Sequence, residues 1–190
     1  GPITALDTHQ PFLEEVDRRA RAAGFHDRIT TVNASMSEMP FPENSFDVIW
    51  SEGAMYMMGF EEALNAWKKF LSPHGSIVAT EPCWLRTDPP EVLQKHWAEY
   101  PGMTTIEETQ KRITRAGYEE TGHFTLPNAS WWNEYYTPKE QRLVMLREKY
   151  KDNPETLAQL EESQHELDVH RAYGDQNYYG YVFFVMRRLR

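Results

Sequence analysis

The stretch at residues 3–16, ITALDTHQPFLEEV, decides the fold of this chain. Its first four residues are apolar or β-branched and predict a short buried strand, which stops at the carboxylate of Asp7. From Phe12 onward apolar residues recur at helical spacing, and Pro11 suits the first turn of a helix. A buried strand that ends on an acidic residue and leads at once into a helix is typical of α/β proteins with a parallel sheet.

The same alternation of strand and helix continues as far as residue 80, and after Glu81 the pattern becomes mainly helical. The predicted strands lie at residues 29–32, 46–50, 76–80, 118–126 and 178–187, and the predicted helices at residues 60–71, 89–100, 105–116, 138–150 and 154–173. Such alternation implies right-handed crossovers and a mostly parallel sheet with helices on its faces. The sequence therefore predicts an α/β fold.

Composition narrows the function classes. The 190 residues suffice for one domain of ordinary size. A formal net charge of −9 without a long basic run argues against nucleic acid as a partner, and no apolar run reaches the roughly 20 residues of a membrane span. The single cysteine, Cys83, fits a reducing compartment, so we expect a cytoplasmic protein that binds neither nucleic acid nor membrane.

An open parallel sheet binds its ligand at the carboxyl ends of its strands. The residues at or just after these ends are Asp7, Thr8 and His9, then Asn33, Ala34, Ser35 and Met36, then Trp50, Ser51, Glu52 and Gly53, and finally Thr80, Glu81 and Pro82. Asp7 can accept hydrogen bonds from both hydroxyls of a ribose. It can equally cap the helix that starts near Pro11. Its position alone leaves both roles open.

Residues 34–49, ASMSEMPFPENSFDVI, favour the ligand-binding role. Met39-Pro40-Phe41-Pro42 is followed by Ser45-Phe46-Asp47, which leads into a predicted strand, and residues 70–77, FLSPHGSI, lead into the next one. In this order and at these spacings, the sequence resembles the class I S-adenosylmethionine-dependent methyltransferases. It is most similar to their small-molecule type, such as the ubiquinone/menaquinone-biosynthesis C-methyltransferases.

The resemblance implies a Rossmann-like methyltransferase fold in one domain over residues 1–190, with an antiparallel C-terminal strand. Residues 1–81 would form the cofactor-binding half, and residues 82–190 a helical insertion and the last strands on the substrate side. In the family a glycine-rich loop and a first strand precede the acidic residue by about 20 positions. Only six residues precede Asp7, so we expect the first strand to be missing here and the sequence to be part of a longer protein.

The resemblance also implies that the cofactor is S-adenosylmethionine. Asp7 would hold the ribose, and Thr8 and His9 would lie beside the ribose and adenine. Ser35 stands where the family usually has an aspartate that faces the adenine amino group, and Met36 would meet the adenine ring. Serine is a weaker, neutral acceptor, so we expect this departure to loosen adenine recognition.

Ser51 and Glu52 would lie near the methionine portion of the cofactor. Glu52 and Tyr56 are the candidates for a general base, which is needed only if the methyl acceptor must lose a proton. Glu52 can equally bind the cofactor. The sequence therefore predicts methyl transfer to a small, partly apolar molecule, with an NAD(P)-dependent oxidoreductase and a non-catalytic interaction module of the same fold as the alternatives.

Aromatic residues cluster after residue 84, and two interpretations of them stay open. They can form a core together with the face of a homodimer, or they can line an apolar substrate pocket. We expect Cys83 to be a packed thiol and not a nucleophile, because no base lies near it in the sequence.

Two histidines follow glutamates by four residues, as His165 follows Glu161 and His170 follows Glu166. This spacing places each pair on one face of a helix. We expect solvated helix pairs and no metal site.

Overall fold

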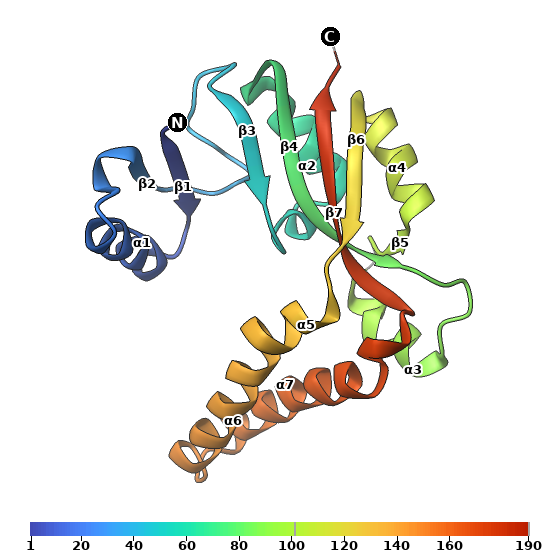
Figure 1. The fold of residues 1–190 in the computed structure, drawn as a ribbon. Helices are drawn as coiled ribbons and strands as arrows, with labels where there is room; N and C mark the ends of the chain where they lie inside the picture. The colour runs from blue at the N-terminus through green and yellow to red at the C-terminus, as the bar shows by residue number, and fades with distance from the viewer. Residues whose placement is uncertain (101, 190) are drawn as a thin grey trace. The chain divides into compact units, whose positions relative to one another are not determined.

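The computed structural model describes residues 1–100 and 102–189, and Figure 1 shows its ribbon. The chain divides into two compact units, Gly1–Ser45 and Phe46–Arg190. Among the described residues, no helix has both the length and the apolar character that are needed to cross a bilayer.

The first unit is a short α/β motif. Strand β1 (Ile3–Asp7) is followed by helix α1 (Gln10–Ala22), a 3₁₀ turn and strand β2 (Ile29–Asn33). β1 and β2 pair in parallel from Ile3 opposite Ile29 to Asp7 opposite Asn33, so both strands end at the same edge. Leu13 and Ala20 of α1 are buried. The predicted strand, helix and strand are thus confirmed.

The second unit contains a larger mixed sheet. Its strands are β3 (Phe46–Ser51), β4 (Leu71–Trp84), β5 (Thr104–Thr105), β6 (Tyr118–Thr125) and β7 (Tyr179–Arg188). The main order is β3-β4-β7-β6, and β5 pairs with β4. β4 is parallel to β3 and β5, whereas β7 is antiparallel to both of its neighbours. The antiparallel C-terminal strand predicted from the resemblance is confirmed.

Helices of the second unit form two groups along this sheet. Figure 1 shows α2 (Phe60–Trp67) and α4 (Ile106–Arg115) beside the upper part of the sheet. α3 (Glu91–His96), α5 (Asn128–Trp131), α6 (Thr137–Lys149) and α7 (Pro154–Tyr173) lie toward its lower end. Leu64 of α2 is fully buried, and its carbonyl accepts a hydrogen bond from the hydroxyl of Tyr118 at 2.8 Å. The upper group therefore covers the sheet, and the lower group is the predicted helical insertion.

Strand β4 is longer at both ends than the sequence predicts. The pattern placed residues 60–71 in one helix and ended the strand at Thr80, but β4 runs from Leu71 through Trp84. At its start Leu71 pairs with Phe46, across a register shift that takes in the Pro73-His74-Gly75 segment. At its end Trp84 pairs with Tyr179 of β7. Both extensions of β4 depend on pairing with strands that are distant in sequence, and the local pattern of apolar residues carries no information about such pairing.

Residues 128–136 also differ from the prediction. They form helix α5 and a π-helical turn at Trp132–Tyr136, where the sequence pattern indicated no helix. Their cluster of aromatic residues lacks a clear helical period, so the long-range packing of these rings decides the conformation.

Candidate active site

In the first unit, Asp7 organises the turn between β1 and α1. Its Oδ1 accepts a hydrogen bond from the backbone N–H of His9 at 2.7 Å, and its carbonyl accepts one from the N–H of Ala34 at 3.1 Å. The residue that caps α1 is His9, whose side chain makes no capping hydrogen bond. Asp7 therefore is not the N-cap residue of α1, contrary to that alternative. Its carboxylate holds the turn that leads into α1, and its backbone carbonyl ties the end of β1 to the segment after β2.

The segment after β2 forms a second tight turn at the same edge. The hydroxyl of Ser35 lies 2.7 Å from that of Ser37 and accepts a hydrogen bond from the backbone N–H of Ser37 at 3.2 Å. The carbonyl of Ser35 accepts the N–H of Glu38 at 3.1 Å. Because β1 and β2 end opposite each other, Asp7 at the end of β1 and Ser35 just after β2 lie at the same edge of this small sheet. Thr8, His9 and Met36 are their neighbours in the chain.

In the second unit, the loop after β3 is tied to β4. Ser51 is the buried last residue of β3, and the indole N–H of Trp50 donates to the carboxylate of Glu52. Gly53 has φ +58°, and its N–H donates to the hydroxyl of Thr80 at 2.8 Å. This turn requires a positive φ, which glycine adopts without strain. It positions Glu52 and the following Tyr56.

A cleft of about 1650 Å³ opens within the second unit beside this loop. Glu52, Gly53, Tyr56 and Thr80 line it, together with residues of α3, α5, α7 and β7. Nine of its lining side chains are aromatic, among them Tyr56, Trp97, Tyr100, Trp131, Tyr181 and Phe183. The structure thus brings Glu52 and Tyr56 into one cleft, which also takes up most of the aromatic cluster after residue 84 and favours the pocket interpretation.

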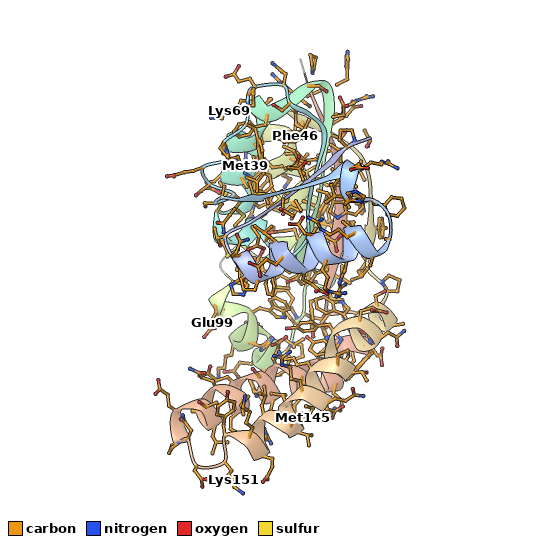
Figure 2. All side chains as sticks on the ribbon, turned by 90° about the vertical axis from the view of Figure 1, so that its left-hand side faces the viewer. Met39, Phe46, Lys69, Glu99, Met145 and Lys151 are labelled. Atoms are coloured by element: carbon orange, nitrogen blue, oxygen red, sulfur yellow. The ribbon has the colours of Figure 1, made fainter. Side chains whose placement is uncertain are left out.

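Rings in the cleft contact one another from different elements. The centroid of the Tyr56 ring lies 5.1 Å from that of Tyr100, and the Trp131 centroid lies 4.7 Å from that of Tyr181 in an edge-to-face arrangement. Figure 2 labels Glu99 in the short helical turn after α3, at a level between the strands and the pair α6 and α7. Glu99 therefore places a carboxylate among the aromatic side chains that line the cleft.

Behind the cleft lies a buried carboxyl, that of Glu81, whose residue directly follows the strand predicted at residues 76–80. Glu81 is 2% exposed, and Tyr100, whose side chain lines the cleft, donates its hydroxyl to Oε2 of Glu81 at 3.2 Å. Burial raises the pKa of Glu81 to about 7, although the Tyr100 hydrogen bond and the nearby Arg112 act in the opposite direction. The sequence signal for this group is its place at the end of the strand predicted at residues 76–80, and the sequence does not report its burial.

His170 is buried, and the expectation of a solvated pair with Glu166 is wrong for it. Its Nδ1 lies 3.0 Å from the hydroxyl of Tyr179 and its Nε2 lies 2.7 Å from Oδ1 of Asn128. Since Oδ1 only accepts, Nε2 carries the proton and Nδ1 accepts from Tyr179. Burial lowers the pKa of His170 to about 4. The ring is also stacked on Tyr136 at 4.2 Å, so it anchors α7 to β7 and α5.

Cys83 is fully buried, as the packed-thiol interpretation predicts. Its sulfur lies 3.7 Å from the hydroxyl of Thr109, and burial raises the pKa of the thiol to about 12. The thiolate that a nucleophile requires is therefore disfavoured.

Comparisons with known proteins agree with the fold. Residues 1–79 match a family model described as a methyltransferase domain. The chain is 24% identical to 27-O-demethylrifamycin SV methyltransferase of Amycolatopsis mediterranei, over 98% of this chain and 68% of that enzyme. It is 34% identical to the ubiquinone/menaquinone biosynthesis C-methyltransferase of Roseobacter denitrificans, over 43% of this chain and 33% of that enzyme.

A solved structure shows the same architecture. The S-adenosylmethionine-dependent methyltransferase of Geobacter sulfurreducens, in complex with S-adenosylhomocysteine, superposes with a TM-score of 0.76 at 20% identity, over 96% of this chain and 74% of that one. The shared architecture is the Rossmann-like fold of S-adenosylmethionine-dependent methyltransferases. The methyltransferase-domain model thus covers the N-terminal 79 residues of this chain, and over nearly its whole length the chain has the fold of these methyltransferases.

Proposed function

We propose that the protein methylates a small, partly apolar molecule bound in the cleft of the second unit. The observation that carries this proposal is the cleft itself, with its nine aromatic side chains and the Glu52–Tyr56 loop on its wall. A concave, mainly apolar site with a few polar groups is the usual form of a small-molecule site. Residues 1–81 would serve mainly the cofactor and residues 82–190 mainly the acceptor.

The cofactor contacts that we propose follow the strand ends. Asp7 binds the ribose hydroxyls, Thr8 and His9 lie beside the nucleoside, Ser35 and Met36 meet the adenine, and Ser51 contacts the methionine portion. The chemistry of this set fits such a ligand, because Asp7 places a carboxylate at the strand edge where Ser35 also lies. A carboxylate that receives hydrogen bonds from two hydroxyls makes strong, charge-assisted contacts.

The chain's own part in the reaction is alignment and, where needed, proton removal. S-adenosylmethionine supplies an electrophilic methyl group on its sulfonium. The aromatic walls of the cleft exclude water and orient the acceptor so that its nucleophilic atom lies in line with that methyl. We infer that Glu52 or Tyr56 takes the acceptor's proton if the acceptor must lose one.

Two relatives support a small-molecule acceptor by their names. One is named for 27-O-demethylrifamycin SV and another for the biosynthesis of ubiquinone and menaquinone. The aromatic lining of the cleft is what supports a partly apolar acceptor for this chain.

We also infer a cytoplasmic location and a homodimer. The single, buried Cys83 suits a reducing compartment. Figure 2 shows Met145 on α6, and this side chain and its neighbour Val144 are 71% and 68% exposed, which suits a contact between two copies. Light scattering after size exclusion would measure the mass in solution, and a monomeric mass would contradict the dimer.

Two assays test the proposed function. Titration calorimetry is expected to show one-to-one binding of S-adenosylhomocysteine and none of NAD⁺, whereas NAD⁺ binding would favour the oxidoreductase alternative. Incubation with methyl-tritiated S-adenosylmethionine and the small-molecule fraction of a cell extract should move label into an organic product. Label that stays on the donor, although S-adenosylhomocysteine binds, would favour the non-catalytic alternative.

A further inference from the structure

The charged side chains along the cleft are almost all acidic. Six glutamates line the cleft, against one lysine, Lys95, and no arginine. The glutamates are Glu52, Glu91, Glu99, Glu161, Glu162 and Glu166. The whole sequence has 29 acidic and 20 basic residues, so the excess in the cleft is much larger than composition explains.

Only half of these carboxylates have a cation beside them. Glu91 pairs with Lys95 at 2.7 Å, Glu161 pairs with Arg147 at 3.2 Å, and Glu166 pairs with Lys139. Across the described part of the chain, Glu52, Glu99 and Glu162 form no ion pair. A cleft whose walls have a low dielectric constant and whose charges share one sign concentrates its field and attracts counter-ions.

The aromatic walls add a second attraction for a cation. Ring faces carry the negative part of the aromatic quadrupole, and organic cations bind over them. In the cleft, Tyr56 and Tyr100 lie 5.1 Å apart and Trp131 and Tyr181 lie 4.7 Å apart, each pair inclined, so that rings face the cavity from several directions. An apolar molecule without charge would use these rings alone, and the unpaired carboxylates would have no role in its binding.

We propose that the methyl acceptor carries a basic amine, protonated at neutral pH, which the cleft binds through its aromatic faces and its unpaired carboxylates. This inference rests on the proposed function, namely that the cleft holds the acceptor. Acceptors that carry a carboxylate or phosphate are disfavoured, because like charges in a binding site repel. The amine is the group that the cleft recognises, and the methylated atom can be elsewhere in the molecule.

Three ring-matched probes test the charge preference directly. 1-Naphthylmethylamine is a cation, 1-naphthylmethanol is neutral and 1-naphthoate is an anion, on the same apolar ring. In calorimetric titrations of the whole protein at low salt, the amine should bind about tenfold more tightly than the alcohol, and the anion most weakly. Raising the salt concentration should weaken the binding of the amine and leave the binding of the alcohol unchanged, because ionic screening acts only on the charged probe.

Variants of the carboxylates locate the effect. Glu99→Gln and Glu162→Gln should each weaken binding of the amine by about 1.5- to 5-fold, the range of one exposed charge pair, and leave the alcohol unchanged. Glu155→Gln is the matched control, since Glu155 is exposed on α7 and does not line the cleft. It should change the binding of neither probe.

Each outcome decides for or against the inference. Equal affinity for amine and alcohol, or tightest binding of naphthoate, would overturn the cationic acceptor and leave the cleft as the acceptor site. An equal loss of amine binding in Glu155→Gln would overturn the assignment to the cleft carboxylates. Failure of all three probes to bind would overturn the cleft as a small-molecule site as well. Methyl-label transfer is measured without these probes, so the two proposals can fail separately.

Discussion

At the scale of single residues, Glu81 is a buried acid whose charge is costly near neutral pH. Its pKa of about 7 in the folded protein lies above the ordinary value of 4.5. Between these values the folded protein holds a proton that the unfolded chain releases. Glu81 therefore contributes most to stability below pH 4.5, and this contribution, of about 3 kcal/mol, is lost as the pH rises through about 7.

Glu81→Gln should remove this pH dependence. The amide keeps an acceptor for the Tyr100 hydroxyl and carries no charge, so the variant should gain stability relative to the wild type as the pH rises from 5 to 8. Urea unfolding at several pH values measures the difference. Glu119→Gln, at an exposed glutamate paired with Arg187, serves as the control and should show no such trend. A constant difference between wild type and Glu81→Gln across this range would show that Glu81 is ionised throughout.

His170 has the opposite dependence. Its pKa in the folded protein, about 4, lies below the ordinary value of 6.5, so the unfolded chain binds a proton that the folded protein does not. The contribution of His170 to the stability of the folded protein is present above pH 6.5 and is lost as the pH falls toward 4. His170→Phe should flatten this part of the profile. The substitution should also lower the free energy of unfolding by about 1–3 kcal/mol at pH 7, because the buried hydroxyl of Tyr179 loses its hydrogen-bond partner. Wild-type stability at pH 7 in the variant would contradict the anchoring role.

Ser35 stands where the resemblance to the methyltransferases leads us to expect an aspartate, and it allows a gain-of-binding test. In the structure its hydroxyl is engaged with Ser37 in a local turn. An aspartate can accept the same backbone N–H and offer its second oxygen to the adenine amino group. Ser35→Asp is therefore expected to tighten the binding of S-adenosylhomocysteine. Unaltered affinity would mean that Ser35 does not face the adenine.

At the scale of elements, the close approach of β4 to β3 at the register shift between them depends on Gly75. A Cβ at this position would lie 3.0 Å from the carbonyl oxygen of Phe46 and 3.2 Å from that of Asp47. These are backbone atoms of a paired strand, so moving them to make room would cost free energy. Gly75→Ala should destabilise the protein by about 1–3 kcal/mol, the usual cost of overpacking. Gly122 in β6 is the matched control, because a Cβ there meets nothing within 4 Å. Thermal unfolding compares the two, and equal effects would contradict the close approach at Gly75.

The elements also show how far the sequence predicts the fold. Local patterns identified β1, α1, β2 and β3 to within one or two residues, because each has its own apolar period and turn residues. Local patterns did not predict the full length of β4 or the helix at residues 128–131, because the first depends on pairing with β7 and the second on the packing of aromatic rings.

The candidate site was only partly predictable for the same reason. Strand ends pointed to Asp7, Ser35 and Glu52, but the buried state of Glu81 and of His170 comes from contacts with Tyr100 and with Tyr179. Such contacts join residues from separate elements, and no spacing in the sequence reports them.

At the scale of the whole molecule, the carboxylate at the end of β1 is the group through which we expect the protein to bind S-adenosylmethionine. Titration calorimetry with S-adenosylhomocysteine on the wild type, Asp7→Ala and the control Asp27→Ala tests it most directly. Asp27 lies in the same unit and its side chain is 87% exposed in the 3₁₀ turn before β2, so its loss should change nothing. We predict one-to-one binding that Asp7→Ala weakens by about 1.5–3 kcal/mol, the scale of hydrogen bonds to a charged group, with a smaller change in stability. Unchanged affinity in Asp7→Ala, or loss of stability without loss of affinity, would contradict the account.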